Sequence, residues 1–166
     1  MKKILSQKSG EIFSDHFETP IGMMEVSAMN DRVLSVFFVD ELKPSKPNNL
    51  TDKTKQQLLE YFDHQRTTFS LPYKAIGTDF QKSVWRQLSK IQYGTTCCYA
   101  DIASDISKPK AVRAVGAANG KNPLTIVVPC HRVIATSGKL SGYAGGVHRK
   151  AWLLAHEVHL KDTKFR

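Results

Sequence analysis

Residues 99–119, which read Tyr99-Ala-Asp-Ile-Ala-Ser-Asp-Ile-Ser-Lys-Pro-Lys-Ala-Val-Arg-Ala-Val-Gly-Ala-Ala-Asn119, decide the fold of the second half of this chain. A short helix, a turn over residues 105–109 and a second helix over residues 110–119 give the pattern of a helix-turn-helix. Pro109 suits the first turn of the second helix. Half of the residues of this helix are Ala or Gly, so its surface carries few large side chains. Arg113 stands among these small residues as a long cation. Such a helix suits either tight packing against another helix or a nucleic-acid groove probed by one side chain.

The segment before this motif predicts another helix. Thr78-Asp-Phe-Gln81 is a capping-box pattern, and Phe80, Val84 and Leu88 follow at helical spacing. Gly94 is the expected stop of this helix. The second half of the chain is therefore expected to be mainly helical.

The first part of the chain predicts a mixed α/β unit. Residues 22–28 and 33–39 have the composition of two strands, joined by a turn at residues 29–31. Residues 51–66 predict an amphipathic helix with Leu58, Leu59 and Phe62 on one side.

The charge of the chain divides at the same place as the predicted structure. Residues 1–73 hold 9 Lys and Arg against 10 Asp and Glu, a net of −1, whereas residues 74–166 hold 15 against 5, a net of +10, so the excess positive charge of the chain lies entirely in its second part. We therefore predict two domains, 1–73 and 74–166. The basic second domain favours a polyanionic partner, nucleic acid above all, although a solvated basic surface remains the alternative.

A candidate nucleophile follows the apolar run over residues 124–128. Cys130 stands beside His131, and an imidazole can raise the small thiolate fraction of a thiol at neutral pH. The pair alone is also compatible with a buried structural cysteine. Asn122 could brace the loop before Cys130, and Glu157 could either orient a histidine or end a solvated helix. The glycine-rich segment 141–146 lacks a phosphate-loop pattern and suits a flexible pocket wall.

Several classes of protein are disfavoured by composition. No stretch approaches the roughly 20 apolar residues of a membrane span, and the basic N-terminus lacks the apolar core of a secretory signal. Three cysteines, two of them adjacent, predict neither a disulfide framework nor a zinc site. A reducing compartment, the cytoplasm or the nucleus of a eukaryote, is the expected location.

Five ordered segments together resemble the O6-alkylguanine-DNA alkyltransferases, also called methylated-DNA–protein-cysteine methyltransferases. The resemblance covers roughly residues 70–158, and its most specific part is Pro129-Cys-His-Arg-Val133. The other segments are Arg113-Ala-Val-Gly-Ala-Ala118, Asn122-Pro123, Gly142-Tyr-Ala-Gly-Gly146 and Trp152-Leu-Leu-Ala-His-Glu157. The resemblance implies a ribonuclease H-like N-terminal α/β part, a small sheet with a helix, and a mainly helical C-terminal domain with a winged-helix-like helix-turn-helix.

The resemblance also implies a reaction: irreversible transfer of an alkyl group from O6-alkylguanine, and by extension O4-alkylthymine, to Cys130. His131 would deprotonate Cys130 through a water, Glu157 would hold His131, and Asn122 would brace the loop. Tyr99 would donate a proton to guanine N3. No cofactor is implied, because the thiol supplies the nucleophile.

The implied partner is double-stranded DNA, bound by a monomer. The target base would be flipped out, Arg113 would fill its place, and Val133, Tyr143 and Ala144 would hold its edge. The resemblance places further DNA contacts at Tyr99, Ala100, Lys108, Ala111, Ala114 and Thr136.

This sequence departs from the family pattern at Cys98, where Ser is common, and at Gln92, where Pro is frequent. Animal members can carry a structural zinc in the N-terminal part, but no Cys precedes Cys97, so no metal is expected here. Two other classes stay open: a non-catalytic DNA-binding protein or lesion sensor, which the presence of Cys130 disfavours, and a cysteine hydrolase, which would leave the basic charge unexplained.

Overall fold

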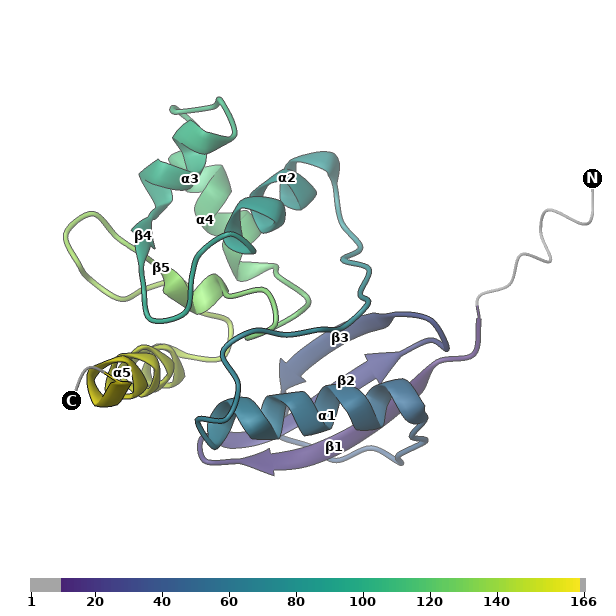
Figure 1. Ribbon diagram of the computed structural model, residues 1–166. Coiled ribbons are helices and arrows are strands. Elements are labelled where there is room, and N and C mark those ends of the chain that lie inside the picture. Colours follow the sequence, from purple (N-terminus) through teal and green to yellow (C-terminus); the bar gives the residue numbers. More distant parts are fainter. Residues whose placement is uncertain (1–9, 165–166) are drawn as a thin grey trace, which may run out of the picture. The chain divides into compact units, whose positions relative to one another are not determined.

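The computed structural model describes residues 10–164, with side chains described as far as residue 158. The chain divides into two compact units, Met1–Lys74 and Ala75–Arg166 (Figure 1). No helix of the described residues is long and apolar enough to cross a bilayer.

The N-terminal unit is built on a three-stranded antiparallel sheet in the order β1-β2-β3 (Figure 1). Its strands are β1 (Phe13–Thr19), β2 (Gly22–Ala28) and β3 (Val33–Phe38). The two predicted strands are thus confirmed, but β1 was not predicted. Only Phe17 of β1 is buried, so this edge strand lacks the regular apolar alternation by which a strand is recognised.

Helix α1 (Asn49–Phe62) packs on this sheet. It begins two residues before the predicted start because Asn48 caps it, accepting a hydrogen bond from the backbone N–H of Thr51. Leu58 and Tyr61 are fully buried and meet the sheet residues Met24, Val26 and Val36 in one core.

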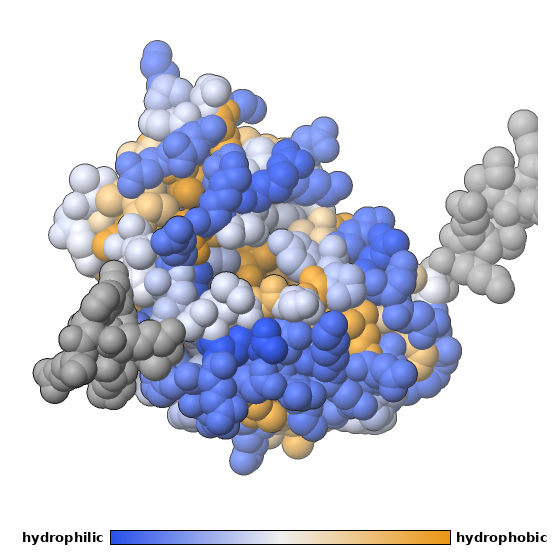
Figure 2. All heavy atoms as spheres, in the orientation of Figure 1, coloured by the Kyte–Doolittle hydropathy of each residue, from blue (hydrophilic) through white to orange (hydrophobic). Residues whose placement is uncertain are grey.

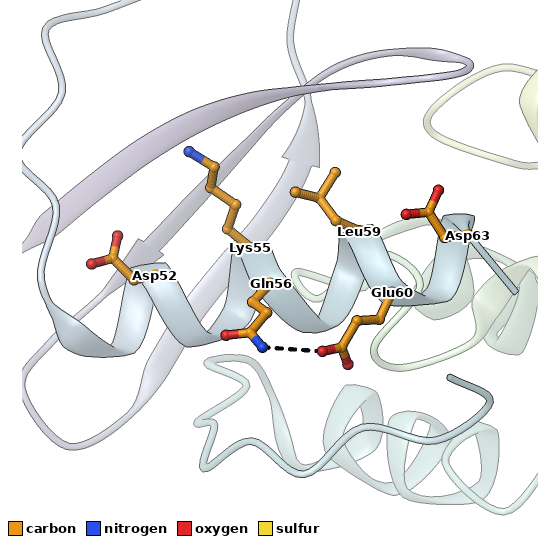
Figure 3. Close-up of a pocket in the computed structure, with 6 residues that line it drawn as sticks. All are labelled: Asp52, Lys55, Gln56, Leu59, Glu60 and Asp63. Carbon is orange, nitrogen blue, oxygen red and sulfur yellow. Dashed lines mark hydrogen bonds between the residues drawn. The ribbon is translucent and has the colours of Figure 1, made fainter. Parts of the chain in front are cut away.

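Leu59 was predicted on the same side of this helix as Leu58 and Phe62, but only the other two are buried. Leu59 is half-buried and lines an open groove on α1, because the core stripe runs through Leu58 and Tyr61 instead. Figure 3 shows this groove, where Gln56 bonds Glu60 at 3.1 Å. Hydrophilic residues cover the exposed face of α1 in Figure 2.

The C-terminal unit contains α2 (Asp79–Leu88), α3 (Tyr99–Asp105), α4 (Val112–Gly120) and α5 (Val147–Lys164). The predicted capping box is confirmed: Thr78 Oγ1 accepts from the Gln81 N–H, and Gln81 accepts from the Thr78 N–H. Gly94 is not the stop of α2, which ends six residues earlier. With a φ of 74°, Gly94 instead forms a later turn.

Helices α3 and α4 and the turn between them confirm the helix pair predicted over 99–119, and α2 packs against both (Figure 1). Pro109 is not in the first turn of α4, because the helix starts at Val112 and Pro109 lies in the connecting turn. Trp85 ties α2 to α4 by donating from Nε1 to the carbonyl of Ala118 at 2.8 Å.

A two-stranded parallel pairing completes this unit. Strand β4 (Cys97–Cys98) leads into α3, and β5 (Val133–Ile134) follows the one-turn 3-10 helix η1 (Cys130–Arg132). The pairing therefore joins the start of the helix-turn-helix to the segment that follows Cys130.

Candidate active site around Cys130

The loop that carries Cys130 is fixed by buried asparagine side chains. Asn122 accepts from the Leu124 N–H at 2.9 Å and donates to the Val128 carbonyl at 2.7 Å. Between these bonds Ile126 has a φ of 71°, which a β-branched residue adopts only when its surroundings impose it. Asn119 adds a bond at 3.3 Å to the carbonyl of Cys130. The thiol is thereby held at the first residue of η1.

The thiol of Cys130 is buried, and its residue is only 5% exposed. Burial raises the pKa of Cys130, while a hydrogen bond from Asn122 and the charge of Lys150 act in the opposite direction. The resting thiol is therefore protonated at neutral pH, and reaction with an electrophile requires a base.

A buried base lies next in the chain. His131 is fully buried, and its Nε2 lies 2.7 Å from Oε1 of Glu157. Burial lowers the pKa of His131 despite the neighbouring carboxylate, so the imidazole is neutral. With Nε2–H donating to Glu157, the lone pair belongs to Nδ1, which has no hydrogen-bond partner among the described residues. A neutral imidazole with a free lone pair can accept a proton.

Arg132 completes this cluster, and our sequence reasoning did not assign it a role. Its guanidinium bonds both oxygens of Glu157, with Nε 3.0 Å from Oε2 and Nη2 2.9 Å from Oε1, and donates to the Ile91 carbonyl at 2.7 Å. Gly94 N–H also reaches Oε2 of Glu157 at 3.2 Å. A long cation that stands between the apolar run at residues 124–128 and the apolar pair Val133-Ile134, as Arg132 does, was the available signal for a buried ion pair.

Glu157 is therefore a buried carboxylate with several donors. Burial alone would raise the pKa of Glu157, but the hydrogen bonds and charges of His131 and Arg132 outweigh it and hold the pKa well below its ordinary range. Glu157 stays ionised and orients the imidazole. Of its two possible roles, a partner of a histidine and a solvated helix end, the structure places it in the first.

A second polar cluster forms around Tyr99, the first residue of α3. The Tyr99 hydroxyl donates to the Ser141 carbonyl at 3.1 Å. Lys150 of α5 donates to the same carbonyl at 2.9 Å and to the Tyr99 oxygen at 3.3 Å. Gly142, at a φ of 67°, lets the loop approach, since a Cβ there would lie 3.3 Å from the Tyr99 oxygen. Lys150 is fully buried and was also missed by our sequence reasoning.

The residues expected to hold the base edge are only partly brought together. Val133 and Tyr143 are buried, and burial together with the charge of Cys130 raises the pKa of Tyr143 well above its ordinary value. Ala144 is exposed in the glycine-rich loop.

The residues expected to contact DNA lie on the outside of the C-terminal unit. Arg113 is exposed on α4, and Lys108 lies above the ring of Phe80 with its Nζ 5.3 Å from the centroid. The other expected contacts are exposed or half-buried: Ala100 lies on α3, Ala111 caps the start of α4, Ala114 lies on α4, and Thr136 follows β5. Within residues 10–158, no group of three His, Cys, Asp or Glu side chains is placed to hold a metal ion.

Known proteins are similar to this chain in sequence and in fold. The family profile described as the DNA-binding domain of 6-O-methylguanine DNA methyltransferase matches residues 79–159. The constitutive methylated-DNA–protein-cysteine methyltransferase of Bacillus subtilis is 45% identical over 149 residues, covering 82% of this chain and 90% of that protein. A relative of the same kind from Methanosarcina barkeri is 43% identical, covering 88% and 97%.

Solved structures agree with the sequence comparison. The O6-methylguanine methyltransferase of Mycobacterium tuberculosis superimposes with a TM-score of 0.83 at 37% identity, covering 90% of this chain and 94% of that one. A structure of the Mycobacterium tuberculosis protein in complex with DNA gives 0.83 at 38% identity, covering 89% and 93%. The buried Cys130, His131 and Glu157 and these likenesses lead to one conclusion: the chain belongs to the methylated-DNA–protein-cysteine methyltransferase family.

Proposed function

We propose that this protein repairs alkylated DNA by direct reversal, taking the alkyl group from O6 of guanine onto Sγ of Cys130. The observation that carries the proposal is the buried thiol beside a neutral imidazole, whose Nε2 is held by Glu157 and whose Nδ1 has no hydrogen-bond partner in residues 10–158. Family membership supplies the substrate class. Each molecule acts once, because a thioether is not readily cleaved.

The reaction moves one alkyl group and one proton. His131 accepts the proton of Cys130 through a water, which explains how a thiol of raised pKa becomes a nucleophile. The S–C bond forms as the C–O6 bond breaks, and the bonding electron pair goes to the purine. Tyr99 donates a proton to guanine N3, so that the base leaves neutral rather than as an anion. No cofactor enters this scheme.

The reacting carbon of O6-alkylguanine lies inside the base stack, so we propose that the nucleotide is flipped out of double-stranded DNA. Flipping costs a few kcal/mol, less for a damaged and weakly paired base. The exposed Arg113 on the small-residue helix α4 would fill the vacated place. Val133, Tyr143 and Ala144 would line the base pocket, and Ala100, Lys108, Ala111, Ala114 and Thr136 would contact the duplex. An O4-alkylated thymine presents the same alkyl–oxygen bond and is included in the proposal.

Finer features of the fold belong to the same proposal. A three-stranded sheet with one packed helix supports a ribonuclease H-like N-terminal unit, and α3 and α4 beside the β4–β5 pair support a winged-helix-like DNA-binding unit. We expect the protein to act as a monomer. Its three free thiols suit a reducing compartment such as the cytoplasm.

A duplex that carries labelled O6-methylguanine tests the proposal. The label should move to the protein once per molecule and be absent from Cys130→Ala, which should keep its affinity for DNA. Cys97→Ala is the matched control, because burial raises the pKa of Cys97 to about 11 and this thiol stays protonated. Transfer that survives Cys130→Ala would refute the proposal. Binding without transfer would indicate a lesion sensor, and repeated turnover a hydrolase.

A further inference from the structure

Asn119 is a buried amide in the last turn of α4, and the reaction proposed above does not use it. Asn119 is 1% exposed. Its Nδ2 donates to the carbonyl of Cys130 at 3.3 Å, although that carbonyl also accepts from the N–H of Val133. Its Oδ1 has no hydrogen-bond partner within residues 10–158. A buried acceptor without a donor lowers stability, and an apolar side chain of similar size would avoid this cost. The amide oxygen therefore needs a donor that the folded chain does not supply.

A second acceptor without a partner lies at the same peptide group. Asn119 holds the carbonyl of Cys130, and the carbon of that carbonyl is bonded to the backbone nitrogen of His131. Nδ1 of the neutral His131 also has no hydrogen-bond partner in the described side chains. Two acceptors cannot bond each other, because neither has a hydrogen to donate. A water molecule has two hydrogens and can serve both.

We infer that Asn119 is a positioning residue for the proton relay, in which its Oδ1 accepts one hydrogen of the water that carries the proton of Cys130 to His131. This inference rests on the proposed function. The water would then make about three hydrogen bonds, the usual number for a buried water. It accepts one from the thiol and donates the other two to Nδ1 of His131 and Oδ1 of Asn119. With both hydrogens engaged, its lone pairs face the thiol.

The relay moves one proton and leaves Asn119 unchanged. The thiol of Cys130 passes its proton to the water oxygen as the water passes one hydrogen to Nδ1 of His131, so a thiolate and an imidazolium form. The S–C bond then forms as the C–O6 bond breaks, and the bonding electron pair goes to the purine. Asn119 keeps the other hydrogen of the water throughout. It thereby prevents the water from turning away from the thiol, and proton transfer depends on such orientation.

Asn119 differs from the charged groups that act on the thiol and the imidazole. Those groups lie on η1 and α5 and are Arg132, Glu157 and Lys150. The amide of Asn119 carries no charge and does not titrate. Replacing it with an apolar residue leaves all three charges in place. A change in the pH dependence of transfer in such a variant therefore reports on the relay.

The test is Asn119→Leu, which removes the donor and the acceptor at similar side-chain size. Transfer from a duplex that carries O6-methylguanine is measured between pH 7 and pH 9, under single-turnover conditions with saturating protein. At pH 7 the variant should be slower by about tenfold or more, a part of the ~100-fold or more that a positioned base contributes. The deficit should shrink as the pH rises, because hydroxide ionises the thiol of Cys130 without the relay. Burial raises the pKa of this thiol, so the relay matters most at neutral pH.

Asn48 provides the matched control, because both ends of its amide have partners. Its Oδ1 accepts from the Thr51 N–H at 2.8 Å, and its Nδ2 donates to the Met29 carbonyl at 3.3 Å. Asn48→Leu should lower the urea midpoint, since it removes the cap of α1, and should leave transfer by the folded protein unchanged at every pH. Asn119→Leu should do the reverse: the urea midpoint stays the same or rises, and transfer at neutral pH falls.

A deficit of Asn119→Leu by the same factor at every pH would overturn the inference, and so would an unchanged rate. Asn119 would then support only the fold of the loop. Asn119→Met gives the same comparison if Asn119→Leu does not fold, as judged by circular dichroism. Absence of transfer in the unmodified protein would instead refute the proposed function, so the two failures can be told apart.

Discussion

The two units place their charges differently. In the N-terminal unit the pair Arg32–Asp31 lies at the surface, with side chains 39% and 64% exposed. In the C-terminal unit the pair Arg132–Glu157 is 7% and 1% exposed, and His131 on the same carboxylate is fully buried. An exposed pair is screened by water and contributes little to stability, whereas breaking a buried pair leaves a charge without compensation.

This difference shows that the same residues support both stability and reactivity in the C-terminal unit, but not in the N-terminal unit. The N-terminal core is made of apolar side chains such as Met24, Val36 and Leu58, and its fold can be altered without touching a reactive group. In the C-terminal unit the carboxylate that holds the imidazole also neutralises a buried guanidinium. Substitutions there should change stability and reactivity together.

The largest effect is expected for Glu157→Gln. Loss of the carboxylate leaves Arg132 buried without a counter-charge, which costs about 3–5 kcal/mol, and His131 loses its anionic partner. Alkyl transfer should fall about 100-fold, the order that a general base contributes. Both tryptophans of the sequence, Trp85 and Trp152, lie in the C-terminal unit, so urea unfolding followed by their fluorescence measures the loss of stability. A variant that transfers slowly but keeps its stability would show that Glu157 acts on His131 without being needed as the counter-charge of Arg132. Stability and reactivity would then not be linked in the C-terminal unit.

Leu58→Ala should come next, at about 3 kcal/mol, because it leaves a cavity under α1. The change should appear as an earlier transition in far-ultraviolet circular dichroism, with the tryptophan transition and the transfer rate unmoved. A tryptophan transition that shifts by the same amount would show that the two units unfold as one.

A smaller effect is expected from pH. Burial lowers the pKa of His131 below the unfolded value of about 6.5, so the unfolded chain binds this proton first as the pH falls. The contribution of His131 to stability is therefore complete above about pH 6.5 and decreases below it, by about 1 kcal/mol between pH 7.5 and 5.5. Urea unfolding at the two values should show this difference, and His131→Gln should remove it. Glu157 adds nothing in this window, because its unfolded pKa of about 4.3 lies below it.

The smallest effect is expected for Arg32→Ala. The Nη2 of Arg32 lies 2.8 Å from Oδ2 of Asp31, but both groups are in water. The urea midpoint should stay within experimental error of the unmodified protein. A clear shift would show that surface charges of the N-terminal unit contribute more than their exposure implies.

Local patterns predicted much of the fold. The capping box at Thr78 and the strand pair β2–β3 were predictable because their bonds lie within a few residues of each other. Strand β1 was not, because an edge strand that is half-buried along most of its length carries little apolar pattern. The end of α2 was misplaced at Gly94, since a glycine is typical of both a helix end and a later turn.

The candidate site was predictable where residues form a contiguous motif. Cys130, His131 and Asn122 stand within nine positions, and the roles assigned to them remain predictions. Arg132 and Lys150 were not predicted as site residues, because a long cation is usually exposed. Only the folded chain shows that these two are buried. Of the two hydrogen-bond partners of Lys150, Tyr99 is 51 residues away, beyond any local pattern.

The short pairing of β4 with β5 has one more consequence. It sets Cys97 opposite Val133 and Cys98 opposite Ile134 through backbone atoms alone. The proposed acid, Tyr99, directly follows the first strand, and the proposed nucleophile lies just before the second, so their spacing does not depend on which side chains occupy 97 and 98. A substitution at either position should therefore leave the distance between the two reagents unchanged. The distance between acid and nucleophile is set by the main chain, and the thiols of Cys97 and Cys98 are not needed for it.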